Sequence, residues 1–154
     1  MWYNLLKRGK RLKIFIDGDG CPVIDITIKV AKENNIECIL ITDTSHVFDK
    51  YDIQVITVSK GADSVDFALV NMLNKDDIVV TQDYGLAAMC LARQAKVINQ
   101  NGIRYTNENI DSLLFTRHLS KKIRMSGERI KGPSKREKEN DEIFEKELRG
   151  IIKC

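Results

Sequence analysis

The amino-acid sequence predicts a three-layer α/β fold with a mostly parallel central sheet. Short runs of β-branched and aromatic residues alternate along the chain with segments whose apolar residues recur at helical spacing, a pattern typical of strands connected by helices. The chain has 154 residues, enough for one domain to bury an apolar core without disulfides or a structural metal. Strands that alternate with helices favour a parallel sheet covered on both faces.

Three strands and two helices are expected in the first half of the chain. Residues 13–16 form a β-branched and aromatic run, and Pro22 suits the first turn of a helix in which apolar residues recur every three or four positions. The apolar runs at residues 36–42 and 53–59 predict a second and a third buried strand. Residues 64–73 place their apolar side chains on one face of a helix.

The second half continues the alternation. Residues 77–82 predict a fourth strand, which leads into a helix over residues 85–94. The remaining expected elements are a short strand at residues 97 and 98, a helix that Asn107 or Asn109 would cap and that runs to Leu114, and an amphipathic helix over residues 139–152.

The expected domain organisation is one α/β core with two flanking segments. The core spans residues 13–116, and residues 1–12 precede it as an N-terminal extension. Residues 117–154 are expected to form a basic segment and a C-terminal helix that packs on the same domain. No apolar run could cross a bilayer, and the apolar segment after the basic N-terminus is too short for a signal peptide, so we expect a cytoplasmic protein with no membrane partner.

Positive charge is concentrated in residues 117–138. This basic segment holds nine Lys or Arg and two Glu, a net charge of +7, whereas the whole chain has a formal charge of +3. Gly127, Gly132 and Pro133 disfavour one continuous helix there. Because lysine and arginine neutralise backbone phosphates whatever the base sequence, the segment predicts binding to nucleic acid; the alternative is a solvated surface without a ligand. The expected contacts are Arg117, Lys121, Lys122, Arg124, Arg129 and Lys131.

Aspartates gather where the predicted strands end. Asp17 and Asp19 follow the first strand, where ligands of open α/β sheets bind, and residues two apart in an extended segment point to the same side. Asp63 and Asp66 follow the third strand, and Asp83 follows the fourth. Each also has a structural explanation. Asp17 and Asp19 could belong to a glycine-rich turn, Asp63 and Asp66 could form a capping-box-like pair, and Asp83 could cap a helix.

If these carboxylates converge, their mutual repulsion requires a cation or raised pKa values. A site of carboxylate oxygens without neighbouring Cys or His suits Mg²⁺ or Mn²⁺ rather than Zn²⁺. The four cysteines and two histidines stand far apart, which favours reduced, structural thiols. A metal site beside a basic segment predicts chemistry on a phosphate of a polyanion.

Several segments of the chain together resemble the YaiI/YqxD family of uncharacterised bacterial proteins, which is related to the PIN-like group of nuclease folds. The segments that carry this resemblance are residues 16–22, 61–66, 77–87, 105–106, 109–110 and 132–133. The resemblance implies a Rossmann-like (PIN-like) three-layer sandwich and a metal-dependent nuclease. By analogy with PIN-like nucleases, Asp17, Asp66 or Asp63, and Asp83 would hold the metal, with the hydroxyl of Thr81 beside Asp83.

Three hypotheses follow for the function. The first is a Mg²⁺- or Mn²⁺-dependent nuclease, acting on RNA more than on DNA, with Asp17, Asp19 and Asp83 as the main ligands and Asp66 as a further catalytic residue. The second is a phosphatase similar to haloacid dehalogenases, in which Asp17 is the nucleophile. The third is a non-catalytic nucleic-acid-binding module whose aspartates only form caps and turns. The oligomeric state is left open.

Overall fold

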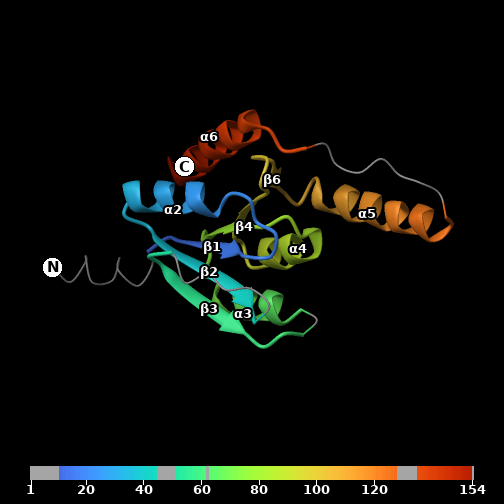
Figure 1. The fold of residues 1–154 in the computed structure, drawn as a ribbon, viewed down its shortest axis with the longest axis horizontal. Helices are drawn as coiled ribbons and strands as arrows, with labels where there is room; N and C mark the ends of the chain where they lie inside the picture. Colours follow the sequence, from blue (N-terminus) through green and yellow to red (C-terminus); the bar gives the residue numbers. More distant parts are fainter. Residues whose placement is uncertain (1–10, 45–50, 62, 128–134, 154) are drawn as a thin grey trace.

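A computed structural model describes residues 11–44, 51–61, 63–127 and 135–153 of the chain. Its six strands form one sheet in the order β3-β2-β1-β4-β5-β6 (Figure 1). The strands are β1 (Lys13–Asp17), β2 (Glu37–Asp43), β3 (Gln54–Val58), β4 (Ile78–Val80), β5 (Lys96–Ile98) and β6 (Arg104–Tyr105). The described helices are α2 (Ile24–Glu33), α3 (Ser64–Met72), α4 (Tyr84–Ala92), α5 (Ile110–Met125) and α6 (Lys138–Lys153).

The sheet is parallel except at one edge, where β6 pairs antiparallel with β5. The central strand β1 has no exposed surface at Ile14, Phe15 or Ile16, because helices cover both faces of the sheet. Ile14 and Ile16 pack in the core layer beneath α2 and α6, while Phe15 packs with the core residues of α3 and α4. The predicted three-layer α/β architecture is confirmed.

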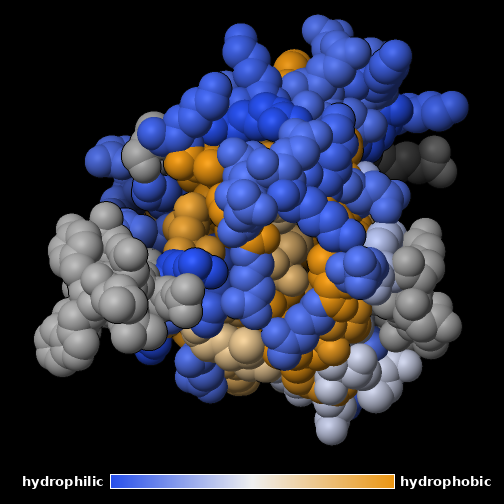
Figure 2. Space-filling view, turned by 90° about the vertical axis from the view of Figure 1, so that its left-hand side faces the viewer, coloured by the Kyte–Doolittle hydropathy of each residue, from blue (hydrophilic) through white to orange (hydrophobic). Residues whose placement is uncertain are grey.

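The C-terminal helix α6 packs on α2. Phe144, Leu148 and Ile151 are buried in the core layer that α2 also contributes to. Arg149 ties the two helices at the surface, because its guanidinium lies 2.7 Å from a carboxylate oxygen of Glu33. The upper part of the molecule, where these helices lie, presents mainly hydrophilic side chains to solvent, with apolar ones beneath (Figure 2). No described helix is both long enough and apolar enough to cross a membrane.

Two elements differ from the sequence-based expectation. The strand β6 was not expected, because two residues leave no alternating pattern to detect. The helix expected to end at Leu114 continues as α5 to Met125, so the basic segment begins on a helix. Gly127, with a φ of +86°, lies just beyond this helix, as glycine often does. Gly132 and Pro133 lie outside the described residues.

The helix α5 extends away from the sheet (Figure 1). Ile110, at its first position, is its one buried residue among sixteen. Most of the helix is therefore not held by packing on the core. Without a buried face, its sequence does not need apolar residues at helical spacing, which is the pattern that reveals other helices. Lys122 and Arg124 lie in its last turn, where positive charge is favourable to the helix dipole.

Candidate active site

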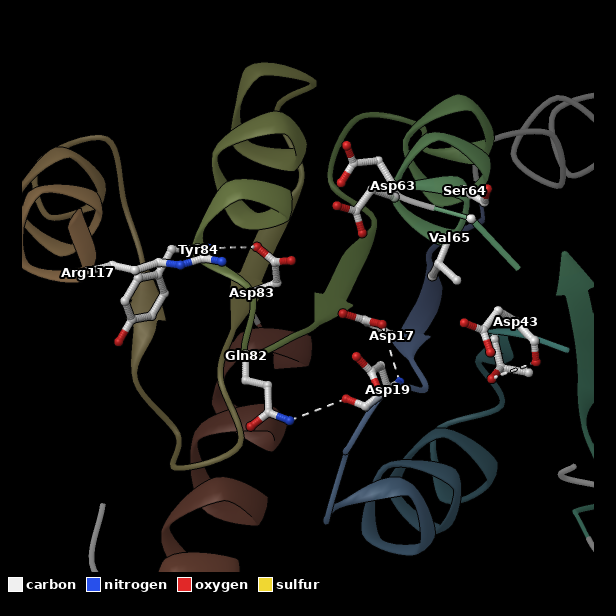
Figure 3. A pocket seen from close by; sticks show the side chains of 13 residues that line it. Asp17, Asp19, Asp43, Asp63, Ser64, Val65, Gln82, Asp83, Tyr84 and Arg117 are labelled. Atoms are coloured by element: carbon white, nitrogen blue, oxygen red, sulfur yellow. Dashed lines mark hydrogen bonds and ion pairs between the residues drawn. The ribbon is translucent and has the colours of Figure 1, made fainter. Parts of the chain in front are cut away.

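A pocket of about 490 Å³ opens at the carboxyl ends of the parallel strands (Figure 3). Because β2, β1 and β4 are neighbours, residues far apart in sequence meet where these strands end. All five aspartates that the sequence singled out line the pocket, together with one that it did not. They are Asp17, Asp19, Asp43, Asp63, Asp66 and Asp83, and we call this hollow the acidic pocket.

Asp17, the last residue of β1, is the most enclosed carboxylate in the acidic pocket, with 7% of its surface exposed. The hydroxyl of Thr81 donates a hydrogen bond of 2.8 Å to its Oδ2, and the backbone amide of Asp19 donates one of 3.4 Å to its Oδ1. Burial raises the pKa of Asp17 despite these two bonds, and the negative charges of Asp19 and Asp83 raise it further. Within the described part of the chain, no Lys or Arg forms an ion pair with Asp17.

Thr81 links Asp17 to Asp83. The backbone amide of Asp83 donates a 3.0 Å hydrogen bond to the Thr81 hydroxyl, which in turn donates its hydrogen bond to Asp17. Asp83 also caps α4, because its Oδ1 accepts hydrogen bonds from the amides of Gly85 at 2.8 Å and Leu86 at 3.2 Å. The capping explanation for Asp83 is therefore confirmed, and the same side chain still lines the acidic pocket.

Asp63 and Asp66 contribute from the start of α3. The alternative explanation of these two residues as a capping-box-like pair is wrong, because Asp63 adopts a left-handed backbone with a φ of 64° and its side chain makes no capping hydrogen bond. Such a backbone costs an aspartate about 1 kcal/mol or more. Burial raises the pKa of Asp66 to about 6, with further contributions from the charges of Asp83, Asp17 and Asp63. These carboxylates are therefore close enough to disfavour one another's ionisation.

Two residues of this region were not found by sequence reasoning. Asp43 ends β2 beside β1, so the rule that identified the other strand ends would have found it had it been applied to residues 36–42. Gln82 donates hydrogen bonds from Nε2 to the carbonyl oxygens of Asp19 at 3.3 Å and Gly20 at 2.9 Å. Gly20 has a φ of +62°, and a Cβ there would lie 2.9 Å from the Gln82 nitrogen. Gln82 thus fixes the loop that carries Asp19.

The donor set suits a hard divalent cation, because six carboxylates line the acidic pocket and, among the residues that the structure describes, no His or Cys does. The carboxylates border the same hollow from several sides (Figure 3). As the side chains lie, however, the described residues include no group of three or more Asp, Glu, His or Cys arranged to hold one metal ion. The chemistry of the residues fits Mg²⁺ or Mn²⁺, and ligation by three of them requires side-chain rotation, which the exposed Asp19 and Asp63 allow.

The predicted nucleic-acid contacts fall into three groups. Arg117 reaches into the acidic pocket, with its Nη1 3.5 Å from Oδ1 of Asp83. Lys121 and Arg124 line an adjacent hollow, and Lys122 is exposed elsewhere on α5. Arg129 and Lys131 lie outside the described residues.

Comparison with known proteins gives one family. The model of the uncharacterized YaiI/YqxD family matches residues 15–154. A UPF0178 protein from Ruminiclostridium cellulolyticum is 55% identical over 142 residues, covering 92% of this chain and 93% of that protein. A UPF0178 protein from Exiguobacterium sibiricum is 50% identical over 141 residues, covering 92% and 96%. No solved structure matches significantly.

Proposed function

This chain belongs to the YaiI/YqxD family, and from the acidic pocket we propose that it is a Mg²⁺- or Mn²⁺-dependent nuclease that hydrolyses phosphodiester bonds of nucleic acid. We expect RNA to be a better substrate than DNA. The proposal takes its catalytic groups from the acidic pocket and its substrate contacts from α5.

The observation that carries the proposal is the buried carboxylate of Asp17, which has no Lys or Arg partner within the described part of the chain and lies among five other pocket aspartates. Two unit charges 4 Å apart repel by about 1 kcal/mol in water and about 4 kcal/mol at an effective dielectric constant of 20. A protein that only needed a turn or a cap at these positions would not gain from placing six negative charges around one hollow. A divalent cation that these groups bind would offset the repulsion.

The chain's own residues have distinct roles in this proposal. Asp17 is held by Thr81 and by the amide of Asp19, so its orientation is fixed before any ligand binds. Asp83 is held by helix amides, while Asp19 is exposed at the mouth of the acidic pocket, where it would add a further carboxylate for a cation. With a pKa of about 6, Asp66 is suited to accept or hold a proton near neutral pH. A divalent ion would neutralise charge on the phosphate and activate a water.

The phosphatase alternative has less support. It expects an acidic pair after a later strand, and Asp76 and Asp77 instead precede β4. Asp77 is buried at the amino ends of the strands, away from the acidic pocket. Its carboxylate accepts hydrogen bonds there from the amides of Lys13 at 3.0 Å and Asn74 at 2.8 Å. Both of its oxygens therefore serve the fold.

The test is cleavage of labelled single-stranded RNA, single-stranded DNA and p-nitrophenyl phosphate by the purified full chain, with Mn²⁺ or with a chelator. Asp17→Asn keeps the shape of the side chain and removes its charge, and we expect it to abolish Mn²⁺-dependent cleavage of the polynucleotide. Asp52→Asn is the matched control, because Asp52 is fully exposed and lies before the amino end of β3, whereas the acidic pocket lies at the carboxyl ends of the strands. Cleavage that survives in Asp17→Asn, or that needs no metal, refutes the proposal, and turnover of the phosphomonoester alone favours the phosphatase.

A further inference from the structure

A second hollow of about 530 Å³ adjoins the acidic pocket between α4 and α5. Tyr84 and Arg117 line both hollows, so the two are continuous. We call this second hollow the α5 cavity; its other principal residues are Lys121, Arg124 and Met125. A ligand bound in the acidic pocket would therefore have a direct path into the α5 cavity.

The charges of the two hollows are opposite. Arg117, Lys121 and Arg124 are four and three positions apart, so they lie along one face of α5. No carboxylate lines the α5 cavity within the described part of the chain, whereas Arg117 is the one cation that reaches the acidic pocket there. The three cations extend over about 10 Å of helix, counted at 1.5 Å for each residue. This arrangement suits the backbone phosphates next to a phosphate held in the acidic pocket.

Tyr84 adds an aromatic surface to the α5 cavity. Its ring meets Tyr105 edge to face, with the ring centroids 5.8 Å apart and the planes at 68°, which restricts how the ring can turn. Tyr84 is partly exposed, and Figure 3 shows the Arg117 side chain extending beside it toward Asp83. An aromatic ring with cations around it is the usual platform on which a nucleobase stacks.

We propose that the α5 cavity binds the nucleotide next to the scissile phosphate, with the base on Tyr84 and the phosphate on Arg117, Lys121 and Arg124. The substrate class is then single-stranded nucleic acid, because the faces of paired bases in a duplex are covered by their neighbours. The role beside a scissile phosphate rests on the proposed nuclease function. The binding itself does not, and it can be measured without catalysis.

The experiment measures binding of a short fluorescent oligonucleotide to the full chain by anisotropy, in chelator, so that nothing is cleaved. Single-stranded RNA and DNA are compared with a duplex. Tyr84→Leu removes the aromatic face but keeps an apolar side chain, and we expect about a tenfold loss of affinity for single strands and no change for the duplex. Tyr84→Phe keeps the ring and is expected to bind like the wild type.

Charge variants separate stacking from phosphate contact. Lys121→Gln is expected to weaken binding of single strands and duplex alike and to reduce the salt dependence by about one ion. Lys146→Gln removes the same charge from the exposed surface of α6, which lines neither hollow, and is expected to change nothing. The melting temperature of each variant shows that it is folded.

The proposal for the α5 cavity is overturned if Tyr84→Leu binds single strands like the wild type, if it loses single strands and duplex equally, or if the wild type binds duplex as tightly as single strands. Absence of any binding also overturns it. The nuclease proposal fails separately: selective binding of single strands through Tyr84, with no cleavage in Mn²⁺, would leave the α5 cavity as a binding site and remove the enzyme.

Discussion

Replacing Asp66 by Asn should stabilise the metal-free protein at neutral pH. Burial and the neighbouring carboxylates raise the pKa of Asp66 from 3.8 to about 6. Each pH unit corresponds to about 1.4 kcal/mol, so keeping this group ionised costs the fold at most about 3 kcal/mol. Asp66 is partly exposed and lies in the first turn of α3, where a negative charge is favourable, so we expect a gain of about 1–2 kcal/mol for Asp66→Asn.

The pH dependence follows from the direction of the pKa change. Because the folded-state pKa lies above that of the unfolded chain, the folded protein binds more protons between about pH 4 and pH 6. The contribution of Asp66 to the free energy of unfolding of the wild type therefore falls as the pH rises through this interval and remains lower above it. Asp66→Asn lacks this fall, so its advantage should be present above about pH 6 and absent below about pH 4.

Urea unfolding followed by circular dichroism at about pH 4 and about pH 7.5 measures both predictions. Asp52→Asn is again the matched control, because Asp52 is fully exposed and its variant should differ little from the wild type at either pH. Mn²⁺ at a hundred times its Kd should stabilise the wild type by about 2.7 kcal/mol. Asp66→Asn should gain less, because the acidic pocket then presents one negative charge fewer to the cation.

Three results would refute this reasoning about Asp66. The first is an unfolding free energy at neutral pH that equals that of the wild type. The second is a gain of the same size at both pH values, which would show an effect of packing rather than of charge. The third is a loss of stability at neutral pH without metal, which would mean that the carboxylate has a favourable partner.

The other predictions concern the residues that form and hold the acidic pocket. Asp17→Asn should lose the rise in melting temperature that Mn²⁺ gives the wild type; an unchanged rise in a thermal scan would argue against Asp17 as a ligand. Thr81→Val removes the hydroxyl between Asp17 and the amide of Asp83, so we expect a loss of about 1–3 kcal/mol in urea unfolding, and Thr81→Ser should restore most of it. Gly20→Ala places a Cβ 2.9 Å from Nε2 of Gln82 at a φ of +62°, so it should cost about 1–2 kcal/mol, and a melting temperature equal to that of the wild type would contradict this.

The central strands of the sheet could be predicted because burial leaves a direct mark on the sequence. The central strand is covered on both faces. Ile14, Phe15 and Ile16 are therefore all apolar, and apolar residues do not alternate with polar ones along this strand. The convergence of Asp17 and Asp83 on one pocket also follows from sequence, because the carboxyl ends of adjacent parallel strands lie side by side.

Other features depend on tertiary contacts that leave little local signal. Gln82 acts through two carbonyl oxygens of a loop more than sixty positions away in sequence, so its role appears only in the folded chain. The left-handed backbone of Asp63 could not be inferred either, since an aspartate before a helix is more often an ordinary cap. The length of α5 was missed because the helix has almost no buried face.

The exposure of α5 has a consequence for how this helix forms. A helix of sixteen residues that packs on the core only in its first turns is marginal in water over the rest of its length, because starting a helical turn is costly and each further residue adds little. The turns beyond Leu114 are expected to unfold locally at a much lower free energy than the sheet, with faster exchange of their amide hydrogens. Helicity and positive charge then belong to the same element, so a bound polyanion would reduce the repulsion among its cations and favour the helical state over the coil.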